Sequence, residues 1–384
     1  MTLEKKMKYS AVILLILFST IYAQVPSGQT SFPVPKIPFS PKHYVCYRAS
    51  GPVMMDDNLN EGSWKYAAWT DYFVDIQGDL KPNPRYKTRV KMLWDNKYLY
   101  VGAELQEPHL WATLRQRDTV IFDNNDFEVF IDPNGSTQPY YETEINALGT
   151  VWDLLLREPY RDGDKVAVNA WDITGLKVAV KLHGKLDDPA ETDTGWTVEV
   201  AFPWSVLGQC AFKGAPPKPG SQWRINFSRV EWHLIVKDGA YRRERDRSTG
   251  QLLPEDNWVW SPQGIIDMHY PEMWGFLQFS GKIAGQGHDA FKWNPVENAK
   301  WALREIYYGE RNYYTKHHSF TRSIGKLDLQ MLGLNLQKVD GYSWPPEIFI
   351  TPDMFEATIS ANAGNQIVHI RQDGMTWITN SNGR

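Results

Sequence analysis

The alternation of apolar and polar residues between Arg117 and Gly149 predicts two strands joined by a turn. In DFEVFID (126–132) and in YYETEIN (140–146) the side chains alternate with the two-residue period of a strand that has two different faces. The intervening Asp-Pro-Asn-Gly (132–135) has typical turn chemistry. An antiparallel pairing would gather the polar side chains on one face, namely those of Asp126, Glu128, Glu142, Glu144 and Asn146. That face is either a hydrated sheet surface or a binding site.

The same period recurs along most of the chain. It predicts further strands at His43–Arg48, on both sides of the Asp95-Asn96 turn within 85–105, twice within 171–182, at 195–202 before Pro203, at 223–230 and at 274–279. Residues 205–207 can form one helical turn, and we expect Trp94 and Trp204 to point into the core. Many short alternating strands with frequent turn signals predict an all-β fold, an antiparallel β-sandwich of two sheets, over residues 42–281.

The pattern changes after residue 281. Small and flexible residues gather at 281–287, where we place a domain boundary. Apolar side chains then recur at helical spacing between Pro295 and Lys316, which predicts one long helix. Strands are predicted at 347–350, 355–361, 366–370 and 376–378. Residues 288–384 are therefore expected to form a small α+β extension, and they contain no chemical motif that indicates its role.

The N-terminus has the layout of a cleavable secretory signal. Lys5, Lys6 and Lys8 precede an apolar run at 11–18, and Ala23 precedes the polar Gln24. The run is too short to span a bilayer, and no Cys follows it that could carry a lipid. We therefore expect residues 1–23 to be removed, residues 24–41 to be an extended leader rich in Pro, Ser and Gly, and the protein to be secreted or periplasmic.

Composition narrows the classes of partner. The net charge of −4 and the absence of a polybasic run argue against nucleic acid and against an anionic membrane surface. The 17 Trp, 19 Tyr and 16 Phe can fill a sandwich core, and flat aromatic faces also stack on sugar rings. Cys46 and Cys210 are the two cysteines, so one disulfide and two separate buried thiols are both open.

Six blocks of sequence in a fixed order resemble the family 9 carbohydrate-binding modules and the related domains of secreted bacterial proteins. The blocks are LWDNKYLYVGAEL (93–105), NDFEVFIDPNG (125–135), YYETEINALGT (140–150), GWTVEVAFPWSVLG (195–208), WRINFSRVEW (223–232) and WSPQG with MHYPEMWGFLQF (260–279). The resemblance covers most of residues 40–281 and implies a β-sandwich. In the best-known members it also implies a slot that holds a terminal sugar between two Trp rings, with structural calcium ions nearby.

Only some residues of the family's sugar site are present at the matching positions of this chain. The family's carboxylate falls on Glu128 and its Asn on Asn146, whereas the position of its Arg is occupied by Glu144. Phe122 and Asp123 stand where the first Trp would be, and Met268 or His269 where the second would be. The Trp pair is therefore absent, and Trp152 or Trp258 are candidates to supply a ring. The resemblance implies binding of an oligosaccharide or polysaccharide in carbohydrate catabolism, with Glu128, Asn146, Glu144, Phe122, Asp123 and His269 as the candidate site.

Alternatives remain for each of these groups. The acidic loops at 123–126 and 132–134 offer the hard oxygen ligands that calcium prefers, although Asp and Asn are also common in turns. Two carboxyls such as Glu128 and Glu144 are what a glycoside hydrolase needs, but no catalytic motif accompanies them. A haem or redox module would use Met92 or Met268 with His269, without a Cys-x-x-Cys-His attachment site. A charged run at 242–247 is expected to be a solvated mobile loop. We therefore favour a non-catalytic carbohydrate-binding protein over an O-glycosyl hydrolase and over a haem protein.

Overall fold

The computed structural model describes residues 31–56, 58–60 and 62–380. The predicted signal at 1–23 and the first part of the leader lie outside these residues. In the part described, no helix has both the length and the apolar character needed to cross a bilayer.

Strands make up most of the regular structure. The strands of the large sheet are β1 (His43–Arg48), β2 (Val74–Asp75), β3 (Thr88–Trp94), β4 (Tyr98–Gln106), β5 (Asp126–Asp132), β6 (Tyr140–Asn146), β7 (Val151–Leu156), β8 (Ala167–Val168), β9 (Lys177–His183), β10 (Gly195–Pro203), β11 (Gln222–Glu231), β14 (Asp256–Val259) and β15 (Gly275–Ile283). A separate hairpin consists of β12 (Leu234–Lys237) and β13 (Ala240–Arg243). Helical turns are η1 (Trp64–Tyr66), η2 (Gly78–Leu80), η3 (Ile121–Asp123), α1 (Trp204–Leu207), η4 (Pro271–Met273), η5 (Ile324–Lys326) and η6 (Leu329–Leu332).

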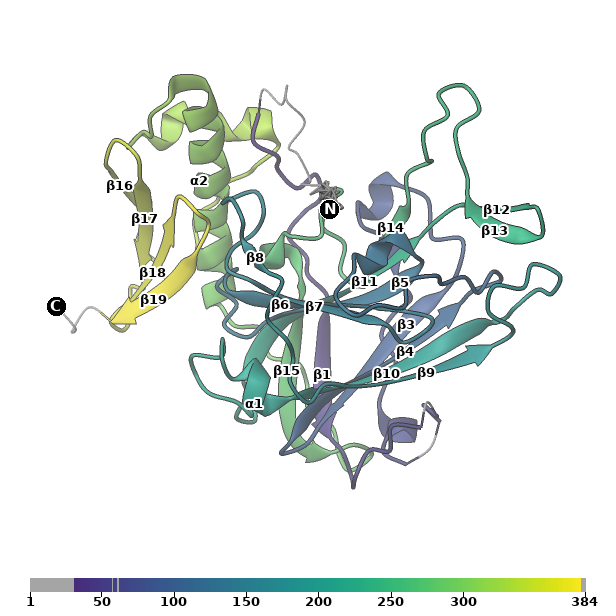
Figure 1. Ribbon diagram of the computed structural model, residues 1–384. Helices are drawn as coiled ribbons and strands as arrows, with labels where there is room; N and C mark the ends of the chain where they lie inside the picture. Colours follow the sequence, from purple (N-terminus) through teal and green to yellow (C-terminus); the bar gives the residue numbers. More distant parts are fainter. Residues whose placement is uncertain (1–30, 57, 61, 381–384) are drawn as a thin grey trace, which may run out of the picture.

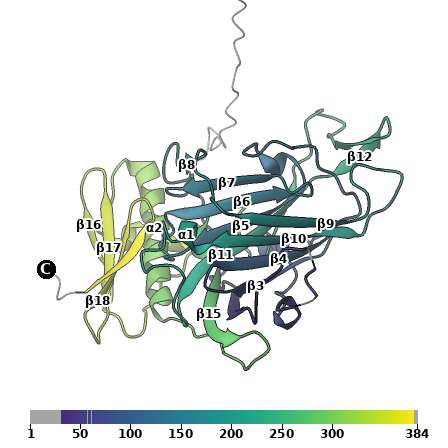
Figure 2. The ribbon, with the colours of Figure 1, turned by 60° about the horizontal axis from the view of Figure 1, so that its bottom comes forward.

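The large sheet folds over on itself to make a sandwich, as the alternation predicted (Figure 1). Its strand order is β8-β7-β6-β5-β11-β15-β1-β3-β4-β10-β9. Strand β1 runs parallel to both β15 and β3 and so joins the two layers, while the other pairings in this order are antiparallel. Figure 2 shows the layer of β5, β6 and β7 lying over the layer of β3, β4 and β10.

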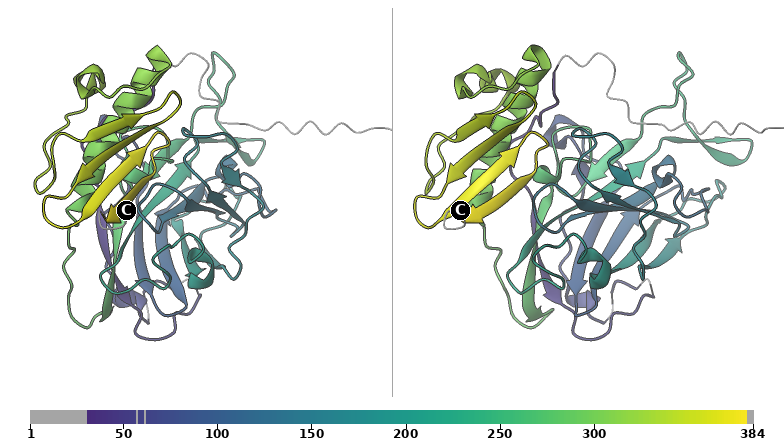
Figure 3. Two further views of the ribbon diagram at one scale, coloured as in Figure 1. Left: turned by 90° about the vertical axis from the view of Figure 1, so that its left-hand side faces the viewer. Right: turned by 60° about the vertical axis from the view of Figure 1, so that its left-hand side comes forward.

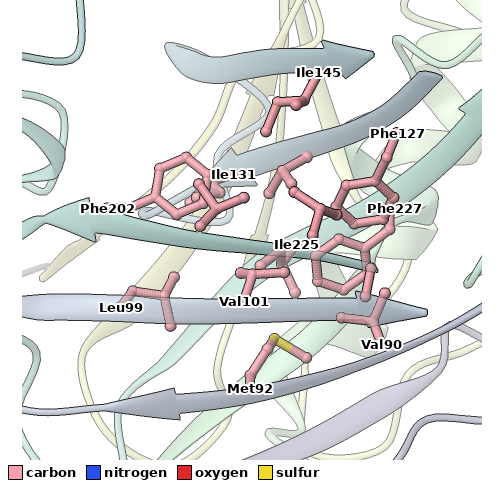
Figure 4. Close-up of a cluster of buried hydrophobic side chains, with 14 of the residues drawn as sticks. Val90, Met92, Leu99, Val101, Phe127, Ile131, Ile145, Phe202, Ile225 and Phe227 are labelled. Atoms are coloured by element: carbon pink, nitrogen blue, oxygen red, sulfur yellow. The ribbon is translucent and has the colours of Figure 1, made fainter. Parts of the chain in front are cut away.

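The core lies between the two layers and is built from one face of each strand. Phe127, Val129 and Ile131 of β5 are each at most 1% exposed, and they pack with Val90, Met92, Leu99 and Val101 of the opposite layer (Figure 4). Trp94 and Trp204 join the same core edge to face, with ring centres 6.3 Å apart, as expected. Because these inward positions fill the core, the alternating polar positions of β5 and β6 must face the other way.

The C-terminal extension follows its prediction closely. The long helix is α2 (Val296–His317), and the four strands are β16 (Glu347–Ile350), β17 (Phe355–Ser360), β18 (Gln366–Arg371) and β19 (Thr376–Asn380). They form an antiparallel sheet in sequence order. Helix α2 lies between this sheet and the sandwich, so the extension covers one side of the sandwich (Figure 3).

The leader packs on the extension. The Phe39 ring stacks on Trp301 of α2 with ring centres 4.4 Å apart, and Phe32 lies edge to face against Tyr307. The backbone of Phe32 also exchanges two hydrogen bonds with the amide of Asn312. The described part of the leader therefore belongs to the core beside α2, a role that its Pro and Ser content did not indicate.

Three sequence predictions need correction. Of the two runs predicted within 171–182, only the second is a strand, because Trp171 lies in a turn and stacks on Tyr141. Strand β7 was not predicted, because apolar residues occupy both of its faces and hide the alternation. The charged run at 242–247 begins inside β13, where Arg243 pairs with Asp123 and is not a mobile loop residue.

The two cysteines are free and buried. Cys46 lies in β1 and Cys210 follows α1, and both contribute to the sandwich core. The sequence left open one disulfide or two separate thiols, and the structure has two separate thiols.

Candidate functional site

The register of β5 and β6 places the candidate polar residues on one face. Asp126 lies opposite Asn146, Glu128 opposite Glu144, and Phe130 opposite Glu142. The shared face predicted from the alternation is therefore confirmed. It is not a hydrated surface, however, since Glu128 and Glu142 are each 5% exposed and the other three polar residues less.

Few hydrogen bonds hold the carboxylates of this face. The backbone N–H of Phe122 donates to Glu144 Oε2 at 2.9 Å, and that of Val230 donates to Asp126 Oδ1 at 3.2 Å. The second oxygen of Asp126 and Oε2 of Glu142 are buried without a hydrogen-bond partner among the described residues. Glu128 lies opposite Ser228 of β11, whose hydroxyl likewise has no partner there.

Burial is the main cause of the raised pKa values of the acidic residues on this face. Loss of hydration raises the pKa of Glu128 to about 7. Burial first, and then repulsion from the Glu128 carboxylate, raise the pKa of Asp126, Glu142 and Glu144 well above the ordinary range. At neutral pH these acids therefore hold protons unless a cation compensates their charge.

Asn146 supports the backbone around the site. Its amide nitrogen donates to the carbonyl of Leu114 at 2.8 Å, and its oxygen accepts from the backbone N–H groups of Leu148 and Thr150. Asn146 is fully buried. In this conformation its side chain fixes the turn after β6.

Phe122 and Asp123 of η3 border the face at one end. The Phe122 ring is 38% exposed, and the carbonyl of Phe122 accepts a hydrogen bond from the Trp232 indole at 2.8 Å. Asp123 forms an ion pair with Arg243, whose guanidinium lies over the Trp232 ring. The hairpin of β12 and β13 thereby fixes the position of η3.

His269 and Tyr160 border the other end. The His269 ring nitrogen Nδ1 lies 2.7 Å from the hydroxyl of Tyr140, and the Tyr160 ring packs edge to face on His269 with centres 4.5 Å apart. Burial first, and then the charge of Arg161, lower the pKa of His269 to about 3, so that it is neutral at physiological pH. Tyr160 is 41% exposed, and the sequence analysis missed it because it lies in a loop without any periodic signal.

Of the two further Trp candidates, Trp152 is placed beside the face. It is half-buried and lies opposite Glu144 in the register of β6 and β7. Trp258 is 2% exposed and packs against Tyr86 and Arg229, so it cannot stack on a ligand.

The loops expected to bind calcium have their oxygens engaged elsewhere. Asp132 accepts the backbone N–H groups of Asn134, Gly135 and Thr137 with its two carboxylate oxygens. The oxygen of Asn124 accepts the N–H groups of residues 113 and 114, and that of Asn125 accepts the N–H of residue 232. Asp132, Asn124 and Asn125 therefore fix the backbone of their loops, whereas Asp126, the last residue of the first loop, belongs to the carboxylate face. Of the two ligand pairs of the haem alternative, Met92 with His269 lacks a geometry, because Met92 lies in the core on the opposite side of the sheet from His269.

A concave region lies between the sandwich and the extension. This groove has a volume of about 630 Å³. Polar side chains such as Gln222 and Lys292 line it, together with five aromatic residues, Phe212, Trp223, Phe276, Trp293 and Trp377. The sequence did not indicate it, because its lining residues come from separate segments of the chain between residues 134 and 378.

Comparison with known proteins places the sandwich in a family context. The family described as "Carbohydrate family 9 binding domain-like" matches residues 55–227, which include every candidate site residue except His269. The chain is 30% identical over 117 residues to the exoglucanase XynX of Acetivibrio thermocellus, which is 30% of this chain and 9% of that protein. It is equally similar to endo-1,4-beta-xylanase A of Thermoanaerobacterium saccharolyticum, over 30% of this chain and 8% of that protein. The matches thus span about a tenth of these relatives or less.

Solved structures with a similar arrangement include a family 9 carbohydrate-binding module from Caldicellulosiruptor kristjanssonii in complex with cellotriose. It superimposes with a TM-score of 0.39 at 14% identity and covers 65% of this chain and all of that one. A structure described as a putative carbohydrate-binding protein from Bacteroides uniformis has a TM-score of 0.44 at 15% identity, over 63% of this chain and all of that one.

Proposed function

We propose, from the premise that residues 55–227 belong to the carbohydrate family 9 binding domain-like family, that this protein binds an oligosaccharide or polysaccharide without cleaving it. The predicted signal at residues 1–23 supports the further proposal that it acts as a secreted or periplasmic protein in carbohydrate catabolism.

The proposed binding surface is the carboxylate face of β5 and β6 with the rings at its two ends. The observation that carries the proposal is the placement of the exposed Phe122 and Tyr160 rings on either side of Glu128 and Glu144. Aromatic rings stack on the apolar faces of sugars, and carboxyl groups bind their hydroxyls. With a pKa of about 7, Glu128 can both donate a hydrogen bond and accept one near neutral pH.

A titration with soluble cello- and xylo-oligosaccharides tests the proposal. We expect saturable heat of binding and saturable quenching of Trp fluorescence with at least one sugar. Phe122→Ala or Tyr160→Ala should weaken binding roughly tenfold, because each removes a stacking ring. Phe349→Ala is the matched control, since Phe349 of β16 is 52% exposed on the extension, and it should leave binding unchanged.

Two results would contradict this proposal. A flat response to every sugar would argue against carbohydrate binding itself. Loss of binding in Trp293→Ala with normal binding in Phe122→Ala would instead place the sugar in the groove beside the extension.

Glycoside hydrolysis is the alternative that the geometry favours next. Carboxylate oxygens of Glu128 and Glu144 lie within 4.8 Å of each other, and two neighbouring carboxyl groups are what a retaining hydrolase uses. Release of reducing sugar at catalytic amounts of protein, lost in Glu128→Gln, would support hydrolysis over simple binding.

A further inference from the structure

The carboxylate face of β5 and β6 gathers buried acidic groups that no cationic side chain of the described residues pairs with. Asp126, Glu128 and Glu144 each present an oxygen, and these oxygens all lie within 4.8 Å of one another. All three residues are at most 5% exposed. No Lys, Arg or His of the described chain forms an ion pair with any of them. Buried carboxylates are otherwise paired or coordinate a metal.

In a second acidic cluster of the same protein, an arginine side chain balances the negative charge. Asp118, Asp153 and Asp172 are also close enough to share one ion. There the guanidinium of Arg117 pairs with all three carboxylates, with nearest atoms at 3.6 Å for Asp118 and 3.3 Å for Asp172. An arginine thus already occupies the place of a cation.

Two further oxygens without partners belong to the first cluster. Asp126 Oδ2 accepts no hydrogen bond from the described residues, although Asp126 is fully buried. Ser228, which is 1% exposed, lies directly opposite Glu128 on the neighbouring strand; its hydroxyl lowers the pKa of that carboxyl but forms no hydrogen bond of normal geometry among the described residues. An unpaired buried hydroxyl beside unpaired carboxylates is the arrangement that a bound cation would satisfy.

We propose that Asp126, Glu128 and Glu144, with the hydroxyl of Ser228, bind one hard divalent cation of the calcium, magnesium or manganese class. Every ligand is an oxygen, and no Cys or imidazole of the described residues belongs to the cluster, which is the ligand set that such ions prefer. Calcium bonds of about 2.3–2.6 Å allow oxygens on opposite sides of the ion to be about 5 Å apart, which agrees with the cluster. This site lies on the sheet face, Asp126 is the one ligand that it shares with the Asp and Asn loops, and the proposal does not depend on sugar binding.

Thermal unfolding and calorimetry of the full chain test the site in the absence of sugar. The protein is stripped with EDTA, transferred to metal-free buffer at pH 7.5, and titrated separately with CaCl2, MgCl2 and MnCl2. We expect one of these ions to bind at one per chain and to raise the melting temperature by several degrees, because it binds only the folded state. Binding should also release protons, which is seen as a heat that depends on the ionisation enthalpy of the buffer.

Glu144→Gln and Glu128→Gln should each weaken the binding of that ion at least tenfold. Both variants replace a buried carboxyl without a cationic partner by a neutral amide of the same size, so their metal-free forms should melt at the parent temperature or above it. Asp172→Asn, in the cluster already neutralised by Arg117, is the matched control and should bind the ion like the parent.

Failure of all three ions to bind would overturn the proposal and leave protons as the neutralising charge. Equal weakening in Asp172→Asn and Glu144→Gln would also overturn it. Since no sugar is present, a negative result here is independent of the sugar titration, and a negative sugar titration leaves this result standing.

Discussion

Two buried glutamates of this protein, Glu272 and Glu128, show how neighbours decide the behaviour of a buried charge. Their exposures are almost the same, 6% and 5%. Burial alone would raise the pKa of both, but Arg161 donates to both oxygens of Glu272 at 2.9 Å, and the Tyr308 hydroxyl donates as well. Together with the charge of Arg304, these contacts lower the pKa of Glu272 to about 2, whereas burial raises that of Glu128 to about 7.

The difference matches the roles of the two regions. Glu272 belongs to η4 and joins the sandwich to α2 through Arg161 and Tyr308, so its charge is fixed and serves assembly. Glu128 lies on the face that borders exposed rings, and its charge is left open to a proton, a ligand or an ion. A buried acid with all its partners present points to structure, and one without them points to binding.

Removing the Arg161 charge that pairs with Glu272 should have the largest effect on the free energy of unfolding. Arg161→Met leaves Glu272 buried with much of its charge unpaired, so we expect the free energy of unfolding to fall by roughly 3–5 kcal/mol at pH 7, measured in urea. Arg89→Met is the control, because the Arg89–Glu104 pair is partly exposed and should contribute less than about 1 kcal/mol. If the Arg161 variant loses no more than this control, the pairing of Glu272 does not explain its stability.

The pH dependence of Glu128 should be the next largest effect. Its folded pKa of about 7 lies above the ordinary value of 4.5, so the folded state keeps a proton that the unfolded state releases between these values. Its contribution to stability is therefore lost as the pH rises through this window. In EDTA, between pH 5 and pH 8, the parent should lose roughly 1–3 kcal/mol more than Glu128→Gln, as followed by urea unfolding.

Other groups near Glu128 share this titration and define the control. Asp126, Glu142 and Glu144 act on it or on one another, whereas Glu305 and Glu310, each with a pKa raised to about 7 by burial, titrate beside α2. The last two contribute equally to parent and variant, so the difference between the two curves belongs to the carboxylate face. Parallel curves would show that Glu128 is ionised at pH 5 in the folded protein.

The smallest effect concerns single hydroxyl groups. Tyr308→Phe removes a donor to the ionised Glu272 and should cost about 2 kcal/mol at pH 7, measured by thermal unfolding. Tyr140→Phe removes a contact with the neutral His269 and should cost about 1 kcal/mol, because bonds to charged groups are stronger. Equal costs would indicate that Glu272 is not charged.

Alternation along the chain was sufficient to locate most strands. β1 and β16 begin and end at the predicted residues, and α2 agrees with its predicted bounds within one residue at each end. These patterns are local, because the side-chain period of a strand or helix is set by its own backbone. Strand β7 was missed where that period is hidden, since its two faces are both apolar.

The sequence by itself determined that Asp126, Glu128, Glu142, Glu144 and Asn146 share one face of two strands, because successive side chains point to opposite faces and the apolar ones fill the core. Only the tertiary structure decided that this face is buried, that Tyr160 and His269 border it, and that no cationic side chain of the described residues forms an ion pair with Asp126, Glu128 or Glu144. Those contacts join residues far apart in the chain, as Arg161 and Glu272 do over 111 positions. Periodicity carries no information about such distances, and for this reason the charge state of each carboxylate followed from the fold alone.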